Sequence, residues 1–341
     1  MWLRAVPVFL AFLVMGFADA VGPLVGLAKN EFQLSTTVAA VIPVLGLGMF
    51  GVLSIPTGVL QDTYGRKTVL LLGLTVAFLG LLSASFGLTS FARLLITVLL
   101  IGAGAAIMQV AGNPIMRDVS AEGRYARNLA LGQFIKAIGS LSGPLVPALA
   151  VRYFGAPWQV IFPIYAAVAF IALLSVVPLR LKEKQLEHSP ATFRSCLALL
   201  KDRYAAAMVG GIFLYVGAEV CVSAGIPLYV QERFHLDLTR VGLLGTGLFF
   251  TALTVGRLSG GIILHWMRPE RFFLITGLFS TAAFLALFAG SPAITILAVF
   301  AVGLGFANIF PLIFAIAVER MPQHTNALSG LMVTAIVGGA V

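Results

Sequence analysis

Long apolar runs, separated by short turns that carry most of the charge, are the feature that most constrains the fold of this chain. Eleven runs are long enough to cross the bilayer core of about 30 Å as α-helices, each of which needs about 20 apolar residues. We therefore predict an all-α membrane protein that crosses the bilayer many times. The predicted spans are Val6–Ala28, Thr36–Leu60, Thr68–Leu88, Phe91–Ile115, Leu129–Val151, Trp158–Leu179, Ala205–Val230, Val241–Trp266, Phe272–Gly290, Ala293–Val318 and Ala327 to the end.

The charge pattern agrees with this assignment and gives an orientation. Only 10% of residues are charged, whereas about a quarter are in a soluble globular protein, and the net charge of +9 resides mostly in the turns. Basic turns of this kind face acidic lipid, so we expect no nucleic-acid partner. The positive-inside rule places the N-terminus in the cytoplasm. The two cysteines, Cys196 and Cys221, indicate neither a disulfide framework nor a metal cluster.

A polar stretch divides the spans into two sets. Residues 181–204 mix both signs of charge and read as a cytoplasmic linker between an N-terminal half of six helices (1–180) and a C-terminal half (205–341). Because the eleventh run stops at Val341, we expect the C-terminal half to be incomplete and to lack a twelfth helix. The run at residues 6–28 also contains a formal signal-peptidase site at Ala18-Asp19-Ala20, but it continues to Ala28, which favours a retained helix.

A charged turn recurs at an interval of about two hundred residues. The first copy contains Gly58, Asp62, Gly65, Arg66 and Lys67, and a weaker copy runs from Gly261 through Arg268 to Arg271. We expect small residues to let helices approach, Asp62 to meet the positive end of a neighbouring helix, and Arg66 and Lys67 to face an anionic membrane surface. The same offset aligns Asp19 with Glu219, and Gly102-Ala-Gly104 with Gly303-Leu-Gly305, which indicates two related halves.

Three ionisable residues lie deep in predicted spans, namely Asp19, Lys136 and Glu219. Each costs about 2.5–3.5 kcal/mol to insert, so each requires a reason. Asp19 and Glu219 are candidates for binding a polar solute or exchanging a proton in a shared central cavity. The alternative is a structural ion pair or interhelix hydrogen bond, and Lys136 could be a fixed counter-charge to Asp19.

Amides form the second group of candidates, because they offer a donor and an acceptor that suit sugar hydroxyl groups. They equally often bridge helices. Arg257 is expected to anchor lipid or a loop. We find no nucleotide-binding loop, catalytic triad or zinc motif, so we expect no cofactor, no metal and no enzymatic activity. We also do not expect a receptor, because a receptor would need a sizeable soluble domain. The amides are Gln109, Asn113, Gln133 and Asn308.

The residues of the first charged turn resemble the loop signature of the major facilitator superfamily. More narrowly, the chain resembles the fucose/proton and glucose/galactose symporter family, in segments that begin at Gln109, Tyr215, Val255, Asn308 and Ala335. The resemblance covers nearly the whole chain. It implies a two-half helical bundle and secondary active transport of a monosaccharide by alternating access, with proton or sodium symport, as a monomer in a bacterial inner membrane.

The chain departs from that family at several positions. In the charged turn, Thr63 stands where a basic residue is usual, Gln109 stands where proton-coupled relatives carry an acid, and Lys136 stands at a family asparagine position. Those relatives also carry an acid near Pro23, whereas Asp19 lies one turn earlier. We therefore expect any coupling to involve Asp19 or Glu219. Export of a drug or small metabolite by the same fold is the alternative function. The charged-turn residues Gly58, Asp62, Gly65, Arg66 and Lys67 are expected to act as a conformational gate.

Overall fold

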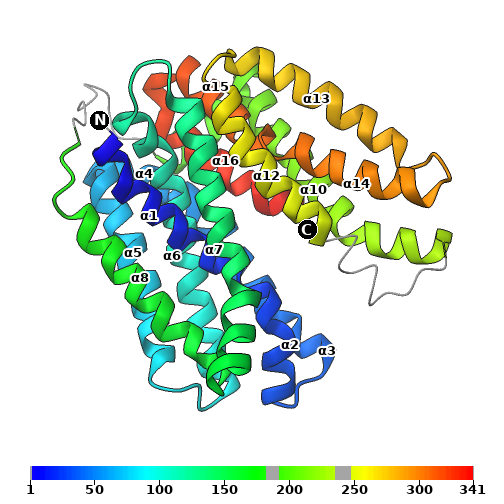
Figure 1. The fold of residues 1–341 in the computed structure, drawn as a ribbon. Helices are drawn as coiled ribbons and strands as arrows, with labels where there is room; N and C mark the ends of the chain where they lie inside the picture. Colours follow the sequence, from blue (N-terminus) through cyan, green and yellow to red (C-terminus); the bar gives the residue numbers. More distant parts are fainter. Residues whose placement is uncertain (1, 182–191, 235–246, 341) are drawn as a thin grey trace.

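The computed structural model describes residues 2–181, 192–234 and 247–340, and the regular elements in these ranges are helices (Figure 1). The helices before residue 181 are α1 (Trp2–Asp19), α2 (Val21–Glu31), α3 (Thr36–Ala39), α4 (Val41–Tyr64), α5 (Arg66–Ser85), α6 (Phe91–Val119), α7 (Tyr125–Phe154) and α8 (Ile161–Val176). Helix α9 (Phe193–Ala198) lies within the predicted linker. It is followed by α10 (Arg203–Phe234), α12 (Leu248–Ile263), α13 (Pro269–Ala286), α14 (Pro292–Phe306), α15 (Ile309–Arg320) and α16 (Thr325–Ala340).

The predicted spans coincide with these helices, although the start of the eighth, at residues 241–246, lies outside the described residues. By length and composition, seven of the described helical segments are able to cross a membrane. Three predicted spans are each divided into two α-helices, namely α1 with α2, α3 with α4, and α14 with α15. A proline, Pro23, Pro43 or Pro311, occupies the first turn of the second helix in each case, where its missing N–H costs no helical hydrogen bond.

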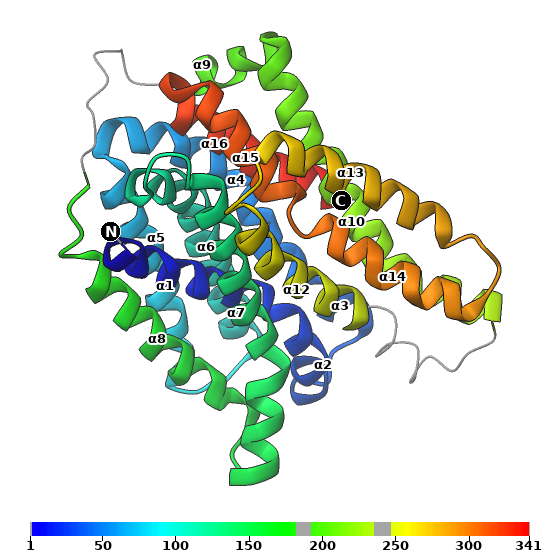
Figure 2. The ribbon, with the colours of Figure 1, turned by 45° about the horizontal axis from the view of Figure 1, so that its top comes forward.

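The helices form two bundles. In the N-terminal bundle, α1 packs on α6, α7 and α8, and α6 packs on α4 and α5. In the C-terminal bundle, α10 packs on α16, and α14 packs on α12 and α13. The bundles meet where α4 contacts α16 and α7 contacts α12, whereas α2 and the α13–α14 turn lie far apart in both views (Figures 1 and 2).

Corresponding glycines explain the matching architecture of the bundles. A Cβ on Gly102 of α6 would lie 2.6 Å from a carbonyl of α4, and one on Gly104 would lie 2.7 Å from a carbonyl of α5. In α14, a Cβ on Gly303 would lie 2.6 Å from a carbonyl of α12, and one on Gly305 would collide with Ser280 of α13. In each bundle, therefore, one helix approaches two partners closely through two glycines spaced two residues apart.

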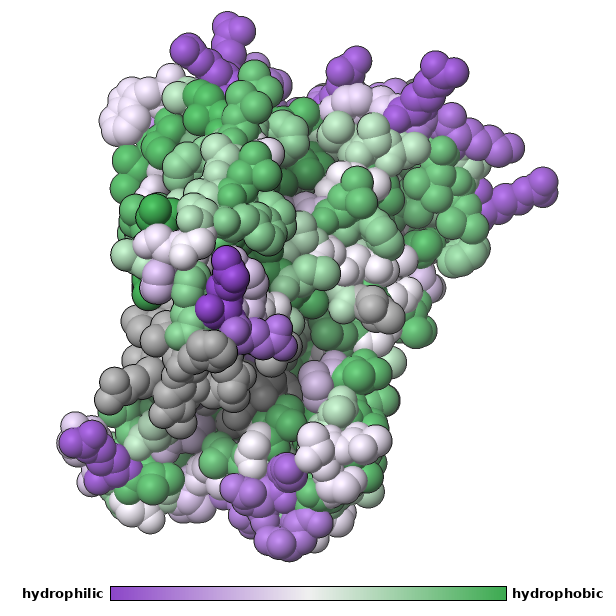
Figure 3. Space-filling model, turned by 90° about the vertical axis from the view of Figure 1, so that its right-hand side faces the viewer, coloured by the Kyte–Doolittle hydropathy of each residue, from purple (hydrophilic) through white to green (hydrophobic). Residues whose placement is uncertain are grey.

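The surface has the layering expected of a membrane protein. Hydrophilic residues gather at the two ends of the molecule, and apolar residues cover most of the band between them (Figure 3). Large apolar side chains of the helices are exposed, among them Leu214 (70%) on α10 and Leu285 (66%) on α13. Such exposure is unfavourable in water and favourable against lipid tails.

Candidate functional site

A polar cluster lies in the N-terminal bundle around Asp19, the last residue of α1. The Lys136 ammonium of α7 is 3.3 Å from the Asp19 carboxylate and donates to Gln109 Oε1 of α6, also at 3.3 Å. The Ser140 hydroxyl, one turn beyond Lys136, donates to Asp19 at 2.9 Å. Three predicted site residues, Asp19, Lys136 and Gln109, therefore form one network.

Glycines position this network. A Cβ on Gly16 would collide with the Lys136 carbonyl, and a Cβ on Gly139 would collide with the Leu13 carbonyl, so α1 and α7 approach to backbone contact. Asp19 lies one turn after Gly16 and is thereby held against α7. Its side chain is 44% exposed, compared with 15% for Lys136, so the carboxylate is open to an approaching solute or proton while the ammonium is largely enclosed.

Gln133 and Asn113 are buried near this network, at 2% and 0% exposure. The Gln133 side chain lies about one helical turn before Lys136 on α7. Gln133 Nε2 and both polar side-chain atoms of Asn113 are buried and have no hydrogen-bond partner among the described residues. Buried amides without protein partners are available to hydroxyl groups of water or solute.

A second polar cluster lies in the C-terminal bundle. Tyr215 and Glu219 are one turn apart on α10, and the buried Tyr215 hydroxyl lies within electrostatic reach of Glu219 and of Arg257 of α12. The Tyr215 hydroxyl and Arg257 Nε have no hydrogen-bond partner among the described residues. Arg257 is half-buried, and its expected role in anchoring lipid or a loop stays a prediction.

Asn308 lies at the junction of α14 and α15 and is 1% exposed. It donates to the Gly256 carbonyl at 2.7 Å, and its side chain fills the space that a Cβ on Gly260 would need. This geometry ties the broken helix to α12. It favours the helix-bridging interpretation of Asn308, one of the two alternatives given by the sequence.

The predicted gate residues lie where the bundles meet, at the end that carries the charged turns, here called the basic end. A Cβ on Gly58 of α4 would lie 2.8 Å from the Asn326 carbonyl of α16, and one on Gly330 would lie 2.8 Å from the Ser54 carbonyl. The Asn326 amide, in the first turn of α16, donates to the Asp62 carboxylate. Asp62 therefore meets the positive end of a helix.

Asn326 also joins Arg66 to this interface. The Arg66 Nε donates to Asn326 Oδ1 at 2.7 Å, and its Nη1 forms an ion pair with Asp118 of α6 at 2.7 Å. Gly65, between α4 and α5, has φ of +81°, a value that strongly favours glycine. Arg66 does not face the membrane surface as predicted; its side chain is 14% exposed because two polar partners hold it inward.

Lys67 also has an internal partner. Its ammonium donates to the Val177 carbonyl at 2.6 Å, just after the end of α8. The carbonyls after a helix end are unsatisfied and carry partial negative charge, which a lysine stabilises. This contact therefore does not support the expectation that Lys67 faces acidic lipid.

A second contact closes the basic end. Arg127 of α7 lies 3.3 Å from His265 Nδ1, just after α12, and a Cβ on Gly261 of α12 would collide with Leu131. In addition, Ser329 of α16 donates to the Val110 carbonyl of α6 at 2.8 Å. The bundles are therefore in contact at the basic end along two lines.

Sequence reasoning missed several members of these clusters. Ser140 and Asn326 are ordinary polar residues in helices, and neither has a signal in the sequence. Asp118 follows Arg117 at the end of a span, and its charge could have suggested a partner for Arg66. Within the described ranges, no group of three His, Cys, Asp or Glu side chains is placed to hold a metal ion.

Comparison with known proteins adds the family. The sequence matches the Major Facilitator Superfamily over residues 8–341. It is 26% identical to a glucose/galactose transporter of Brucella abortus over 97% of this chain and 84% of that protein. It is 22% identical to an L-fucose-proton symporter of Haemophilus influenzae, over 97% and 85%. An enterobactin exporter of Citrobacter koseri is 25% identical over 84% of this chain and 70% of its own length.

The fold is also found in a solved structure. The crystal structure of the transporter FucP in the outward conformation superposes with a TM-score of 0.84, at 20% sequence identity, and covers 98% of this chain and 89% of that one. At this identity the likeness shows the fold alone. Together, the family match across almost the whole chain and the shared two-bundle fold show that this chain belongs to the Major Facilitator Superfamily of membrane transporters.

Proposed function

We propose that this chain transports a monosaccharide of the glucose, galactose or fucose type across a bacterial cytoplasmic membrane, by symport with a proton or sodium ion. The Asp19–Lys136–Gln109–Ser140 network is the observation that carries the proposal. It combines an accessible carboxylate, a fixed cation and neutral hydrogen-bonding groups in one place. The names of the sugar-transporting relatives support the substrate class.

The network links ion binding to rearrangement. Ionised Asp19 holds Lys136 at 3.3 Å, and Lys136 in turn holds the Gln109 carbonyl oxygen. Protonation of Asp19 removes the charge that attracts Lys136, which releases the ammonium and leaves the carboxyl group free to donate to a sugar hydroxyl. Sodium bound by Asp19 would displace Lys136 in the same way. Either ion therefore changes the hydrogen-bonding groups offered to the sugar.

The contacts at the basic end supply the second element of alternating access. We assign this end and the N-terminus to the cytoplasm by the positive-inside rule. The halves 1–180 and 205–341, joined by the linker 181–204, then rock about the sugar site, and the Asp62, Arg66 and Asn326 contacts stabilise the state that is closed to the cytoplasm.

Uptake of labelled glucose, galactose and fucose into proteoliposomes, with and without a pH or sodium gradient, tests the proposal. Asp19→Asn is expected to abolish gradient-driven accumulation and to retain sugar exchange, because it keeps the hydrogen-bonding shape and loses the ionisable group. Glu219→Gln tests the second carboxylate, and Glu122→Gln, on an exposed turn, is the matched control. Sugar flux that is independent of both the pH gradient and the sodium gradient would refute symport.

Export of a small metabolite is the second candidate, favoured by the similarity to an enterobactin exporter. The same vesicles distinguish it. Absence of sugar flux in either direction, in a preparation that binds labelled enterobactin and moves it outward, would replace the sugar proposal with this one.

A further inference from the structure

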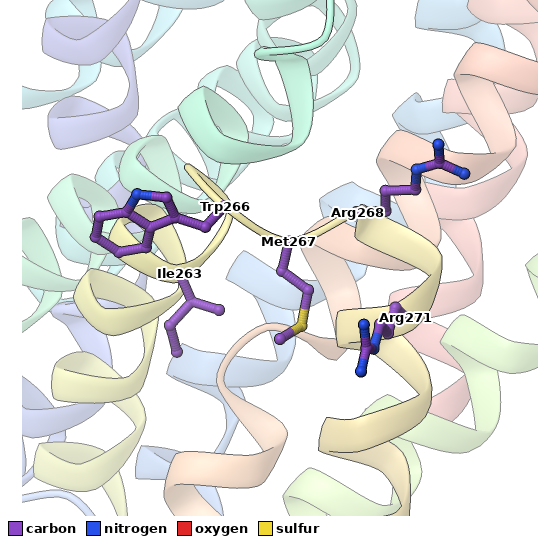
Figure 4. Close-up of a pocket in the computed structure, with 5 residues that line it drawn as sticks. All are labelled: Ile263, Trp266, Met267, Arg268 and Arg271. Atoms are coloured by element: carbon purple, nitrogen blue, oxygen red, sulfur yellow. The ribbon is translucent and has the colours of Figure 1, made fainter.

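A cavity of about 370 Å³ lies at the basic end between α12 and α13, away from the polar clusters described above. Its lining is Ile263, Trp266, Met267, Arg268 and Arg271. Figure 4 shows Ile263 and Met267 in the middle, Trp266 on one side, and the two arginines on the other, at the start of α13. Apolar side chains thus lie beside the start of α13, from which the two arginine side chains extend in different directions (Figure 4).

The two arginines differ from their counterparts in the first charged turn. There, Arg66 is held by Asp118 and Asn326, and Lys67 by the Val177 carbonyl. The side chains of Arg268 and Arg271 are exposed and make no hydrogen bond or ion pair with any described residue.

The acid between these arginines in sequence does not neutralise the cavity. Glu270 is not part of the lining, and it lies close enough to Glu319 of α15 to interact with it. The second copy of the turn therefore presents uncompensated positive charge at the cavity, where the first copy uses its charge internally.

The surroundings of the cavity indicate where a counter-charge comes from. Trp266 is 78% exposed, and a tryptophan at the end of a membrane helix prefers the interfacial layer of the bilayer. Below Arg271, an apolar stripe at helical spacing runs along the exposed face of α13 with Leu274 (61% exposed), Ile275 (44%) and Leu278 (64%). A cationic head above an exposed apolar stripe matches an anionic headgroup above its acyl chain.

We propose that this cavity is a binding site for an anionic phospholipid of the leaflet at the basic end. Arg268 and Arg271 bind the phosphate, Met267 and Ile263 contact the glycerol region, and one acyl chain lies along Leu274 and Leu278. The site is separate from sugar and ion binding, so it does not depend on the proposed transport function.

The fluorescence of Trp266 reports on the site directly. The test uses the full chain with Trp2→Phe and Trp158→Phe, so that Trp266 is the remaining tryptophan. The protein is placed in vesicles of phosphatidylcholine with phosphatidylglycerol, in which either lipid carries brominated chains. Each basic residue near a membrane surface favours anionic lipid by about fivefold, so two arginines give about 25-fold. We therefore expect brominated phosphatidylglycerol to quench at roughly one twenty-fifth of the mole fraction needed for brominated phosphatidylcholine.

Arg268→Gln with Arg271→Gln is expected to abolish this preference. The matched control is Arg180→Gln with Arg203→Gln, which removes the same charge at exposed positions outside the cavity and is expected to keep it. Equal quenching by both lipids in the starting protein would overturn the proposal. Loss of preference in the control pair would also overturn it, since the effect would then be general surface charge.

Discussion

Asn326 forms a hydrogen-bonded link between the bundles at the basic end, and Asn326→Ala tests this link directly. The Asn326 amide uses both its donor and its acceptor between the bundles, donating to Asp62 and accepting from Arg66 at 2.7 Å. Each hydrogen bond to a charged group contributes about 1.5–3 kcal/mol when buried. Because Asp62 is exposed, we take about 1 kcal/mol for each bond, or about 2 kcal/mol in total.

This energy translates into a change of population. For a closed state that holds about 99% of the molecules, a loss of about 2 kcal/mol raises the open fraction about twentyfold, to roughly a quarter. The ion pair between Arg66 and Asp118 lies within the N-terminal bundle and remains in the variant. The variant therefore weakens the contact between bundles without dismantling either bundle.

Cys196 of α9 provides the assay, because it is fully buried in a cluster with Ile55 of α4 and with Ala327 and Leu331 of α16. Opening of the basic end separates these helices and exposes the thiol. In a Cys221→Ser background, we expect Asn326→Ala to raise the rate of maleimide labelling about twentyfold. The control is Ser142→Ala, which removes a hydrogen bond to Tyr165 within the N-terminal bundle. An unchanged rate in folded Asn326→Ala protein would refute the reasoning.

Three further predictions use the same interface. Asp62→Asn is expected to slow turnover more than it weakens substrate binding, measured as transport rate against equilibrium binding, and equal loss of binding would count against the gate assignment. Gly58→Val, whose side chain would meet the Asn326 carbonyl, is expected to raise Cys196 labelling by at least as much as Asn326→Ala, and full protection would contradict a tight α4–α16 crossing. Burial raises the pKa of the Cys196 thiol, and the negative charge of Asp62 raises it further, so the closed state favours the neutral thiol. The stabilisation of the closed state by the neutral thiol is complete below the ordinary thiol pKa of about 8.5 and is lost as the pH rises above it. The rate of maleimide labelling of Cys196, measured from pH 7 to 10, should therefore begin to rise only at a pH above that of an ordinary thiol. In Asp62→Asn, the same rise should occur at lower pH.

Several features of the site follow from local sequence. Asp19, Lys136 and Glu219 are ionisable residues in apolar spans, and their cost alone identifies them as candidates. Gly58, Gly65 and Asp62 occupy a turn whose pattern predicts close helix approach and a helix-end contact, and both are found.

Partner identity could not be obtained in this way. Arg66 was expected to face the membrane surface, yet it binds Asp118 and Asn326. Ser140 and Asn326 carry no signal of their own, because a polar residue gains a role only from what stands opposite it.

The sequence by itself determined the class of the protein, its membrane spans and the internal repeat, because apolar length and glycine spacing are local quantities set by bilayer thickness and helix geometry. The tertiary structure decided which charges pair within a bundle, which join the bundles and which are left for the membrane. Arg66 and Arg268 both lie in short basic turns. Arg66 is bound by Asp118 and Asn326, whereas Arg268 lines an open cavity. Pairing depends on helices brought together from distant parts of the chain, and a single sequence does not contain those distances.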